Sequence, residues 1–182
     1  MNIKVIEYNQ LNIMFEGEYL NGERNGKGKE YYYGGKLKFE GEYLNGKNHG
    51  KAKEYYYTGV LEFEGEYLNG KKHGKSKEYY YDGKLKFEGE YLNGKRNGKG
   101  KEYYKNGELK FDGEYLNGKK WNGKGKIYNI FDKLEFEGEY LNGEKWNGKG
   151  KEYYCDRELK FEGEYLKGKR WNGKGYKKGI IY

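Results

Sequence analysis

Residue types that could bind a metal recur along this chain at a spacing that argues against a metal site. His49 and His73 hold the same place in two neighbouring copies of a repeated segment. In a sheet they would lie about 10 Å apart, which is two strand spacings. The ligands of one metal ion must lie several ångströms closer than that. Because the other copies carry Asn at this place, we assign both histidines to a turn.

Carboxylates and the single cysteine predict no catalytic site either. Glu16, Glu40 and Glu64 recur at one position of the repeat and read as a charge ladder rather than as acid–base pairs. The place of Cys155 is taken by tyrosine, lysine or isoleucine in other copies, which is not expected of a catalytic thiol. The chain shows no nucleophile–base set, phosphate-binding loop or metal-ligand spacing. We therefore predict that it is not an enzyme and uses no cofactor.

A row of tryptophans offers binding chemistry instead. The last three copies of the repeat each insert one tryptophan into the first turn of the unit: Trp121, Trp146 and Trp171. Tryptophan is favoured at protein interfaces. The three side chains should form a row along one long edge of the sheet, and we predict that this row is a partner-binding strip. The alternative is that they only cover the loops.

A basic cluster surrounds the last of these tryptophans. The formal net charge is +8, and half of this excess lies in the last copy. The candidate basic patch consists of Lys167, Lys169, Arg170, Lys174, Lys177 and Lys178. Such a patch can attract an acidic protein, an anionic lipid or a nucleic acid. Lys and Glu are interleaved elsewhere, whereas nucleic-acid binders usually carry a continuous basic stripe, so nucleic acid is disfavoured.

These residues are positioned by a repeat that fills almost the whole chain. The segment Phe-Glu-Gly-Glu-Tyr-Leu, once with Asp for the first Glu, begins every 24 or 25 residues. Its starts are Phe15, Phe39, Phe63, Phe87, Phe111, Phe136 and Phe161. Such a period is typical of repeat proteins, in which each unit buries its apolar face against its neighbours. We predict seven tandem repeats over residues 15–182 and a degenerate capping strand over residues 1–14.

Each unit is predicted to be a β-hairpin. In the copy that starts at Phe39, aromatic and small residues alternate with glutamates over residues 39–44, as in a half-buried strand. Residues 45–50 contain two glycine turn pairs, and Asn-Gly is the strongest short hairpin signal. A second strand follows over residues 51–57. The predicted fold class is therefore all-β: an elongated, single-layer antiparallel meander of repeated hairpins.

The alternation also predicts two different faces. The glutamates of the first strand, opposed by Lys51 and Lys53 of the second, would form a ladder of opposite charges on one face. The other face would be aromatic. This arrangement, however, puts Glu54 on the aromatic face and Tyr55 on the charged face, which a β-bulge could avoid. The register of the second strand stays open at this point.

The composition agrees with a thin, ordered sheet. Hydrophobic residues make up only 34% of the chain, but aromatic residues make up 19% and recur at fixed places. There is no proline to interrupt a β-ladder. The single Cys155 predicts a reducing compartment. We expect no signal peptide and no membrane span, and therefore a cytoplasmic protein, located at the periphery of a membrane if it binds lipid.

The unit resembles the MORN repeat (membrane occupation and recognition nexus). That motif runs Tyr-x-Gly-x-Trp, then Gly-Lys-x-His-Gly, Gly-x-Gly and a later Asp-Gly. In the second copy it falls on Phe39, Gly41, Tyr43, Gly46, Lys47, His49, Gly50 and Ala52, and Asp82-Gly83 supplies the last element in the third copy. Phe and Tyr replace the family's Tyr and Trp, and the longer unit is similar to variant MORN repeats of bacterial and protist proteins.

The resemblance implies a non-enzymatic scaffold for protein–protein contacts or self-association. Phospholipid binding has also been proposed for the family, and its enzymes carry a separate catalytic domain. The first expectation is a protein partner bound along the sheet or its tryptophan edge. The alternative is a peripheral membrane adaptor that binds anionic phospholipid through the basic last repeat. The two open sheet edges also predict a homodimer. Small-ligand capture of the choline-binding type is disfavoured because its sequence pattern is absent.

Overall fold

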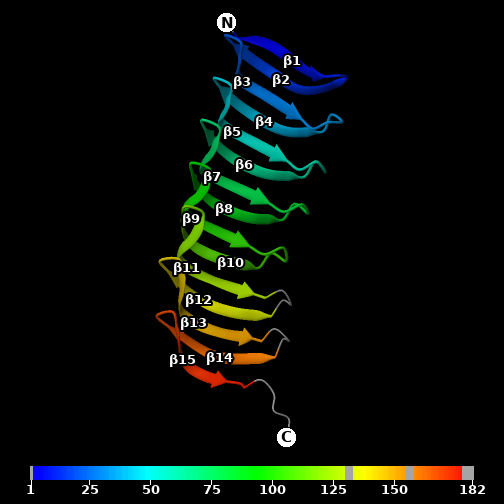
Figure 1. The fold of residues 1–182 in the computed structure, drawn as a ribbon. Coiled ribbons are helices and arrows are strands. Elements are labelled where there is room, and N and C mark those ends of the chain that lie inside the picture. The colour runs from blue at the N-terminus through cyan, green and yellow to red at the C-terminus, as the bar shows by residue number, and fades with distance from the viewer. Residues whose placement is uncertain (1, 130–132, 155–157, 178–182) are drawn as a thin grey trace.

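The computed structural model describes residues 2–129, 133–154 and 158–177. Every regular element in these ranges is a strand, and all the strands form one antiparallel sheet in the order of the chain (Figure 1). The all-β, single-layer meander predicted from the sequence is therefore confirmed. Fifteen strands at about 4.8 Å spacing make a ribbon roughly 70 Å long.

The strands are short and nearly equal in length. Their bounds are β1 (Ile3–Asn9), β2 (Asn12–Leu20), β3 (Glu23–Tyr31), β4 (Leu37–Leu44), β5 (Lys47–Tyr55), β6 (Leu61–Leu68), β7 (Lys71–Tyr79), β8 (Leu85–Leu92), β9 (Lys95–Tyr103), β10 (Leu109–Leu116), β11 (Lys119–Tyr128), β12 (Leu134–Leu141), β13 (Glu144–Tyr153), β14 (Leu159–Leu166) and β15 (Lys169–Gly175). The N-terminal segment lies as β1 along β2.

The turn inside each unit is tighter than the sequence suggested. Asn45 and Gly46 have φ of 48° and 74°, which is the two-residue turn that suits a twisted hairpin. The second strand therefore starts at Lys47 and not at Lys51. The pair His49-Gly50 lies inside this strand and is not part of the turn. His49 is opposite Glu42, and a β-bulge follows at Gly50 and Lys51, where the register shifts and Gly50 takes a φ of 63°.

The alternation of side chains continues past the bulge. Glu40 lies opposite Lys53, and Lys51 lies opposite Glu66 of the next unit. The ladder of opposite charges is therefore real, although Lys51 pairs across units rather than within its own hairpin. The ion pairs along it are half exposed, so each should contribute at most about 1 kcal/mol.

Phenylalanine forms the core of the other face. Phe63 is 0% exposed, and its ring makes edge-to-face contacts with Tyr67 of its own unit and with Tyr91 of the next, at 5.7 and 6.0 Å. The same pair of contacts recurs along the chain. The ring also lies close to a glycine: a Cβ on Gly65 would be 2.9 Å from the Phe63 Cζ. Each core is thus completed by the neighbouring unit.

A cation covers each ring except in the second unit, where Asn48 stands at that place. Lys72 lies 3.9 Å from the centre of the Phe63 ring, and it pairs with Glu54 at 2.8 Å. The hydroxyl of Tyr67 donates a hydrogen bond to the same carboxylate. The glutamate that the alternation puts on the aromatic face is therefore satisfied there, and no bulge moves it away.

The equivalent network of ring, cation and glutamates is most buried in the fourth unit, around Arg96. Its guanidinium lies 4.1 Å from the Phe87 ring centre and pairs with Glu78 at 3.0 Å and Glu102 at 3.6 Å. Burial disfavours the charge of Glu78, but the hydrogen bond and charge of Arg96 outweigh it and lower the pKa of this carboxyl below its ordinary 4.5. Burial likewise opposes ionisation of Glu102, but Lys120 and Lys110 lower its pKa.

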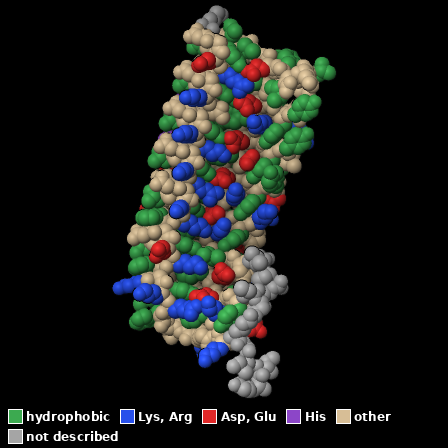
Figure 2. Space-filling model, in the orientation of Figure 1, with side chains coloured by type: hydrophobic (Ala, Val, Ile, Leu, Met, Phe, Trp, Pro, Cys, Tyr) green, Lys and Arg blue, Asp and Glu red, His purple; other side chains and the backbone are tan. Residues whose placement is uncertain are grey.

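Tyrosines also join one unit to the next, at the edge of the sheet that carries the loops between units. The backbone nitrogen of Tyr56 donates to the oxygen of Val60 at 2.9 Å, which closes the loop between units. The hydroxyl of Tyr56 donates to the oxygen of Tyr79, and its ring stacks on Tyr81 at 3.8 Å. Figure 2 shows hydrophobic side chains gathered along this loop edge, on the right, beside interleaved charges of both signs.

Two glycines of the fourth unit should differ sharply in what they tolerate. A Cβ on Gly89 would lie 2.6 Å from the backbone atoms Gly100 Cα and Lys99 O, whereas a Cβ on Gly100 would meet mainly the Phe87 ring, at 2.7 Å. The chain already carries Ala52 at the place of Gly100. We expect Gly89→Ala to cost at least about 2 kcal/mol of unfolding free energy and Gly100→Ala less than about 1. Urea unfolding measures both, and equal losses would contradict the packing described.

The Arg96 network should make the sheet sensitive to acid. Since the folded pKa values of Glu78 and Glu102 lie below 4.5, the stability they confer is complete above that pH and is lost as the pH falls through the folded values. We expect Arg96→Met to lower the unfolding free energy by about 3 kcal/mol at neutral pH, with a much smaller loss near pH 3.

Lys101→Met is the matched control, because Lys101 pairs with Asp112 at 3.7 Å on the half-exposed ladder. It should cost less than about 1 kcal/mol. Unfolding in urea at both pH values gives the comparison. If the two variants lose the same stability, or if the Arg96→Met loss does not shrink in acid, the network does not hold the face together.

Candidate binding site

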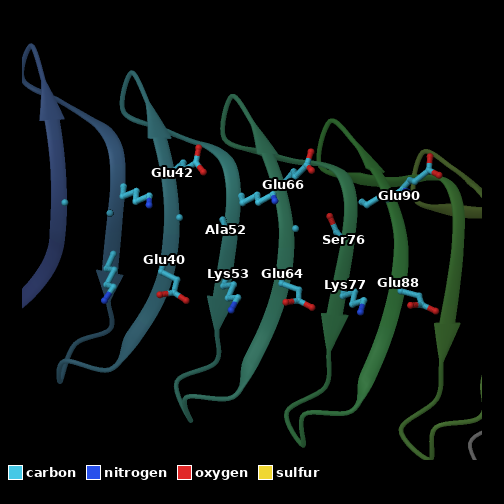
Figure 3. A pocket seen from close by; sticks show the side chains of 18 of the residues that line it. Glu40, Glu42, Ala52, Lys53, Glu64, Glu66, Ser76, Lys77, Glu88 and Glu90 are labelled. Carbon is cyan, nitrogen blue, oxygen red and sulfur yellow. The ribbon is translucent and has the colours of Figure 1, made fainter. Parts of the chain in front are cut away.

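The charged face is hollowed into a long trough that crosses the strands. It has a volume of about 1260 Å³ and is lined by residues from Lys4 on β1 to Asp112 on β10. Figure 3 shows its walls as two rows of charged side chains, with Ala52 and Ser76 between them. We call this surface the trough.

The floor of the trough is bare backbone, for a reason that lies on the opposite face. The floor residues alternate with the charged ones, so their side chains would point toward the phenylalanine rings. Val5 takes this place on β1. From β2 to β9 the floor residues are all small: Gly17, Gly28, Gly41, Ala52, Gly65, Ser76, Gly89 and Gly100. A Cβ on Gly41 would lie 2.9 Å from the Phe39 Cζ. A partner can therefore approach the main chain closely along the whole floor.

The walls alternate in charge from strand to strand. One row contains Glu42, Lys51, Glu66, Lys75, Glu90 and Lys99, and the other contains Glu40, Lys53, Glu64, Lys77, Glu88 and Lys101. Because neighbouring strands lie about 4.8 Å apart, charges of one sign recur about every 9.6 Å. The trough therefore has little net charge but a regular electrostatic pattern.

Tyrosines support the wall that contains Glu40 and Glu64, which lies nearer to the loops between units. The hydroxyls of Tyr55 and Tyr79 donate hydrogen bonds to Glu40 and Glu64, both at 2.6 Å. Burial, and then these hydrogen bonds, raise the pKa of both phenols to about 12. The phenols thus stay protonated and hold the glutamates in place.

A row of leucines borders the other wall, and the sequence analysis missed it. Leu44, Leu68 and Leu92 end the first strands of their units and are 43%, 41% and 46% exposed. They follow Tyr43, Tyr67 and Tyr91, so the alternation turns them to the charged face. The invariant Leu at the end of each Phe-Glu-Gly-Glu-Tyr-Leu segment was the available signal.

The histidines lie at the bulges and not in the turns. His49 is opposite Glu42, and His73 is opposite Glu66. The Nδ1 atoms of both histidines are buried without a hydrogen-bond partner. Within the described ranges, no group of three or more His, Cys, Asp or Glu side chains is placed to hold a metal ion.

The tryptophans also lie in strands, each as the extra residue of a bulge. Between Glu114↔Asn122 and Tyr115↔Lys120, for example, Trp121 has no residue opposite it. Its carbonyl accepts a hydrogen bond from the Gly143 nitrogen at 2.9 Å, and its ring lies against that next turn. Trp121 and Trp146 are half-buried, whereas Trp171 is 71% exposed. The partner-binding strip stays a prediction, and its most accessible member is Trp171.

The candidate basic patch is divided between the two faces. Arg170 lies opposite Tyr165, over the Phe161 ring at 4.7 Å, and forms an ion pair with Glu152. The hydrogen bond from Arg170 lowers the pKa of Glu152 to about 2. Lys174 instead lies opposite Glu162 on the charged face. Lys167 occupies the turn with φ of 51°, Lys169 starts β15, and Lys177 follows that strand.

Two residues from the sequence analysis lie outside the described ranges: Lys178 of the basic patch and Cys155. No helix in the described part of the chain could cross a membrane.

Comparison with known families agrees with this geometry. A family model described as the MORN repeat matches residues 15–36 and 87–108. A second model, described as a MORN repeat variant, matches residues 48–69 and 72–93. No curated protein sequence matches the chain significantly.

Proposed function

Because this chain is a MORN-repeat protein, we propose that it acts as a scaffold without catalytic activity and binds a segment of a partner protein in the trough. MORN repeats are commonly scaffolds for interactions with proteins or membranes. The trough is the observation that carries the proposal, since it is a continuous concave surface built by every unit from β1 to β10.

The dimensions of the trough favour a polypeptide over a small molecule. Pockets for small ligands usually measure about 300–1,000 Å³, and the trough has about 1260 Å³. From β1 to β10 it extends over roughly 40 Å, which an extended segment of about 12 residues would span. The bare floor lets the main chain of such a segment lie close to the sheet.

The chemistry of the walls indicates the kind of segment. Alternating Glu and Lys rows complement a partner that carries charges of both signs rather than one. The exposed leucines Leu44, Leu68 and Leu92 border the same face and would receive apolar side chains. We infer a partner segment with mixed charges on one side and apolar residues on the other. An anionic membrane surface or a nucleic acid would meet as many carboxylates as lysines in the trough.

A test can use a displayed library of random peptides of about 12 residues, selected on the complete chain. The double variant Glu66→Lys/Glu90→Lys reverses two wall charges that form no ion pair with any described residue. We expect it to weaken the selected peptides at least about tenfold, because it puts lysines opposite Lys51 and Lys75. Fluorescence anisotropy measures the affinity, and circular dichroism checks the fold.

The control Glu23→Lys/Glu144→Lys makes the same change of net charge at exposed residues outside the trough, and it should leave binding unchanged. The triple variant Trp121→Asn/Trp146→Asn/Trp171→Asn tests whether the tryptophan row, rather than the trough, binds the peptides. It should bind them like the wild type. Peptides sensitive to the tryptophan variant alone would reject the trough. Flotation with anionic liposomes that survives the trough variant would favour the membrane adaptor instead.

A further inference from the structure

The outer edge of β15 is the place where the repeating pattern stops in the described chain. Each earlier second strand, from β3 to β13, pairs on its outer side with the first strand of the next unit. β15 pairs only with β14, and all of its residues are exposed. Its outer hydrogen-bonding groups thus have no strand beside them among the described residues.

The preceding unit shows what normally lies at such an edge. On β13, Gly148 lies opposite Tyr165, Lys149 opposite Glu164 and Gly150 opposite Gly163. The incoming tyrosine covers the glycine, since a Cβ on Gly150 would be 2.5 Å from the Tyr165 ring. The corresponding residue of β15 is Gly175, and a Cβ there would meet nothing within 4 Å.

Two hydrogen-bond acceptors of β15 also differ from their equivalents in the sixth unit, because no described residue donates to them. In the sixth unit the Trp146 carbonyl accepts from the Gly168 nitrogen at 2.9 Å, and the Asn147 Oδ1 accepts from the Lys167 nitrogen at 3.2 Å. These donors belong to the turn that follows the incoming strand. The corresponding acceptors on β15 are the carbonyl of Trp171 and the Oδ1 of Asn172, for which the described residues supply no such donor.

The charge of this edge specifies its complement. Residues 169–177 contain four cationic side chains and no carboxylate. Each internal first strand supplies two carboxylates to such a neighbour, as Glu162 and Glu164 lie opposite Lys151 and Lys149. On β15, Lys174 stands at the place of Lys149, and Tyr176 stands at the place of Lys151. A second copy of β15 would bring further cations and no carboxylate to this edge, so the edge disfavours its own kind.

We propose that the outer edge of β15 is an acceptor for an acidic strand of another polypeptide, with the pattern aromatic-Glu-Gly-Glu-Tyr followed by a tight turn. The strand adds to the sheet by main-chain hydrogen bonds. Its tyrosine covers Gly175, its second glutamate lies opposite Lys174, and its turn donates to Trp171 and Asn172. This surface is separate from the trough, so the two proposals stand or fall independently.

The exposed Trp171 gives a direct signal for this docking. Trp121 lies against the turn of the following unit at Gly143, and an added strand would bring a turn to Trp171 in the same way. We would measure the emission of Trp171 in the background Trp121→Phe/Trp146→Phe, which leaves a single tryptophan in the chain. The emission should shift to the blue as the 71% exposed side chain becomes covered.

The probe is a synthetic peptide with the sequence of residues 85–94, which contains one first strand and its Asn-Gly turn. We expect saturable binding with the blue shift. Gly175→Leu fills the place of the tyrosine and should weaken binding at least about tenfold. Gly175→Ser is the matched control and should bind like glycine, because Ser76 holds this place in a paired strand. A peptide with both Glu→Lys should also bind at least about tenfold more weakly.

Other results would overturn the proposal. These are the absence of binding, equal affinity for Gly175→Leu and Gly175→Ser, or equal affinity for the charge-reversed peptide. Self-association of the chain that buries Trp171 without peptide, seen by light scattering, would also reject it. The trough variant Glu66→Lys/Glu90→Lys should bind this peptide like the wild type, which keeps the outcome distinct from that of the trough test.

Discussion

The structure depends on the contact of one phenylalanine ring with the glycines beneath it. Each ring packs against small residues of its own hairpin and makes edge-to-face contacts with two tyrosines, one from its own unit and one from the next. A ring of this size can be fully buried in a single-layer sheet only if the backbone beneath it carries no side chain larger than those of Ala52 and Ser76. The glycines, the fixed period and the dependence of each unit on its neighbour all follow from this constraint.

The same constraint divides the functions of the two faces. The groups of the aromatic face are paired with one another. A lysine or arginine covers the ring, and a glutamate on that face, such as Glu54, binds this cation and a tyrosine hydroxyl. Little of this face is left for a partner. The charged face has exposed ladders, a bare floor and a row of leucines, so it is where a partner can bind. At β15 the described residues leave a second, different surface, because none of them forms a strand on its outer side.

Much of this could be predicted from the sequence, and the exceptions have physical causes. Alternation over residues 39–44 and the Asn-Gly pair were enough for the hairpin and its two faces. The bulge at Gly50 was not visible because His49-Gly50 reads as a turn pair, and only the pairing of both strands reveals that it lies inside β5. The trough is lined by residues of ten successive strands, β1 to β10, so no single unit shows it. Trp171 is 71% exposed and Trp146 is half-buried although the same residues, Asn-Gly-Lys-Gly, follow both; among the described residues, only Trp146 has a following unit beside it.

The dependence of each unit on the next can be measured most directly by removing one. Deletion of residues 63–86 takes out 24 residues and joins Glu62 to Phe87, which preserves the segment on both sides. The account predicts a folded sheet that is shorter by about 10 Å in small-angle scattering and has a lower unfolding free energy. Deletion of residues 63–85 leaves one extra residue and should destabilise the sheet further. Unchanged particle length, or equal stability of the two deletions, would contradict the account.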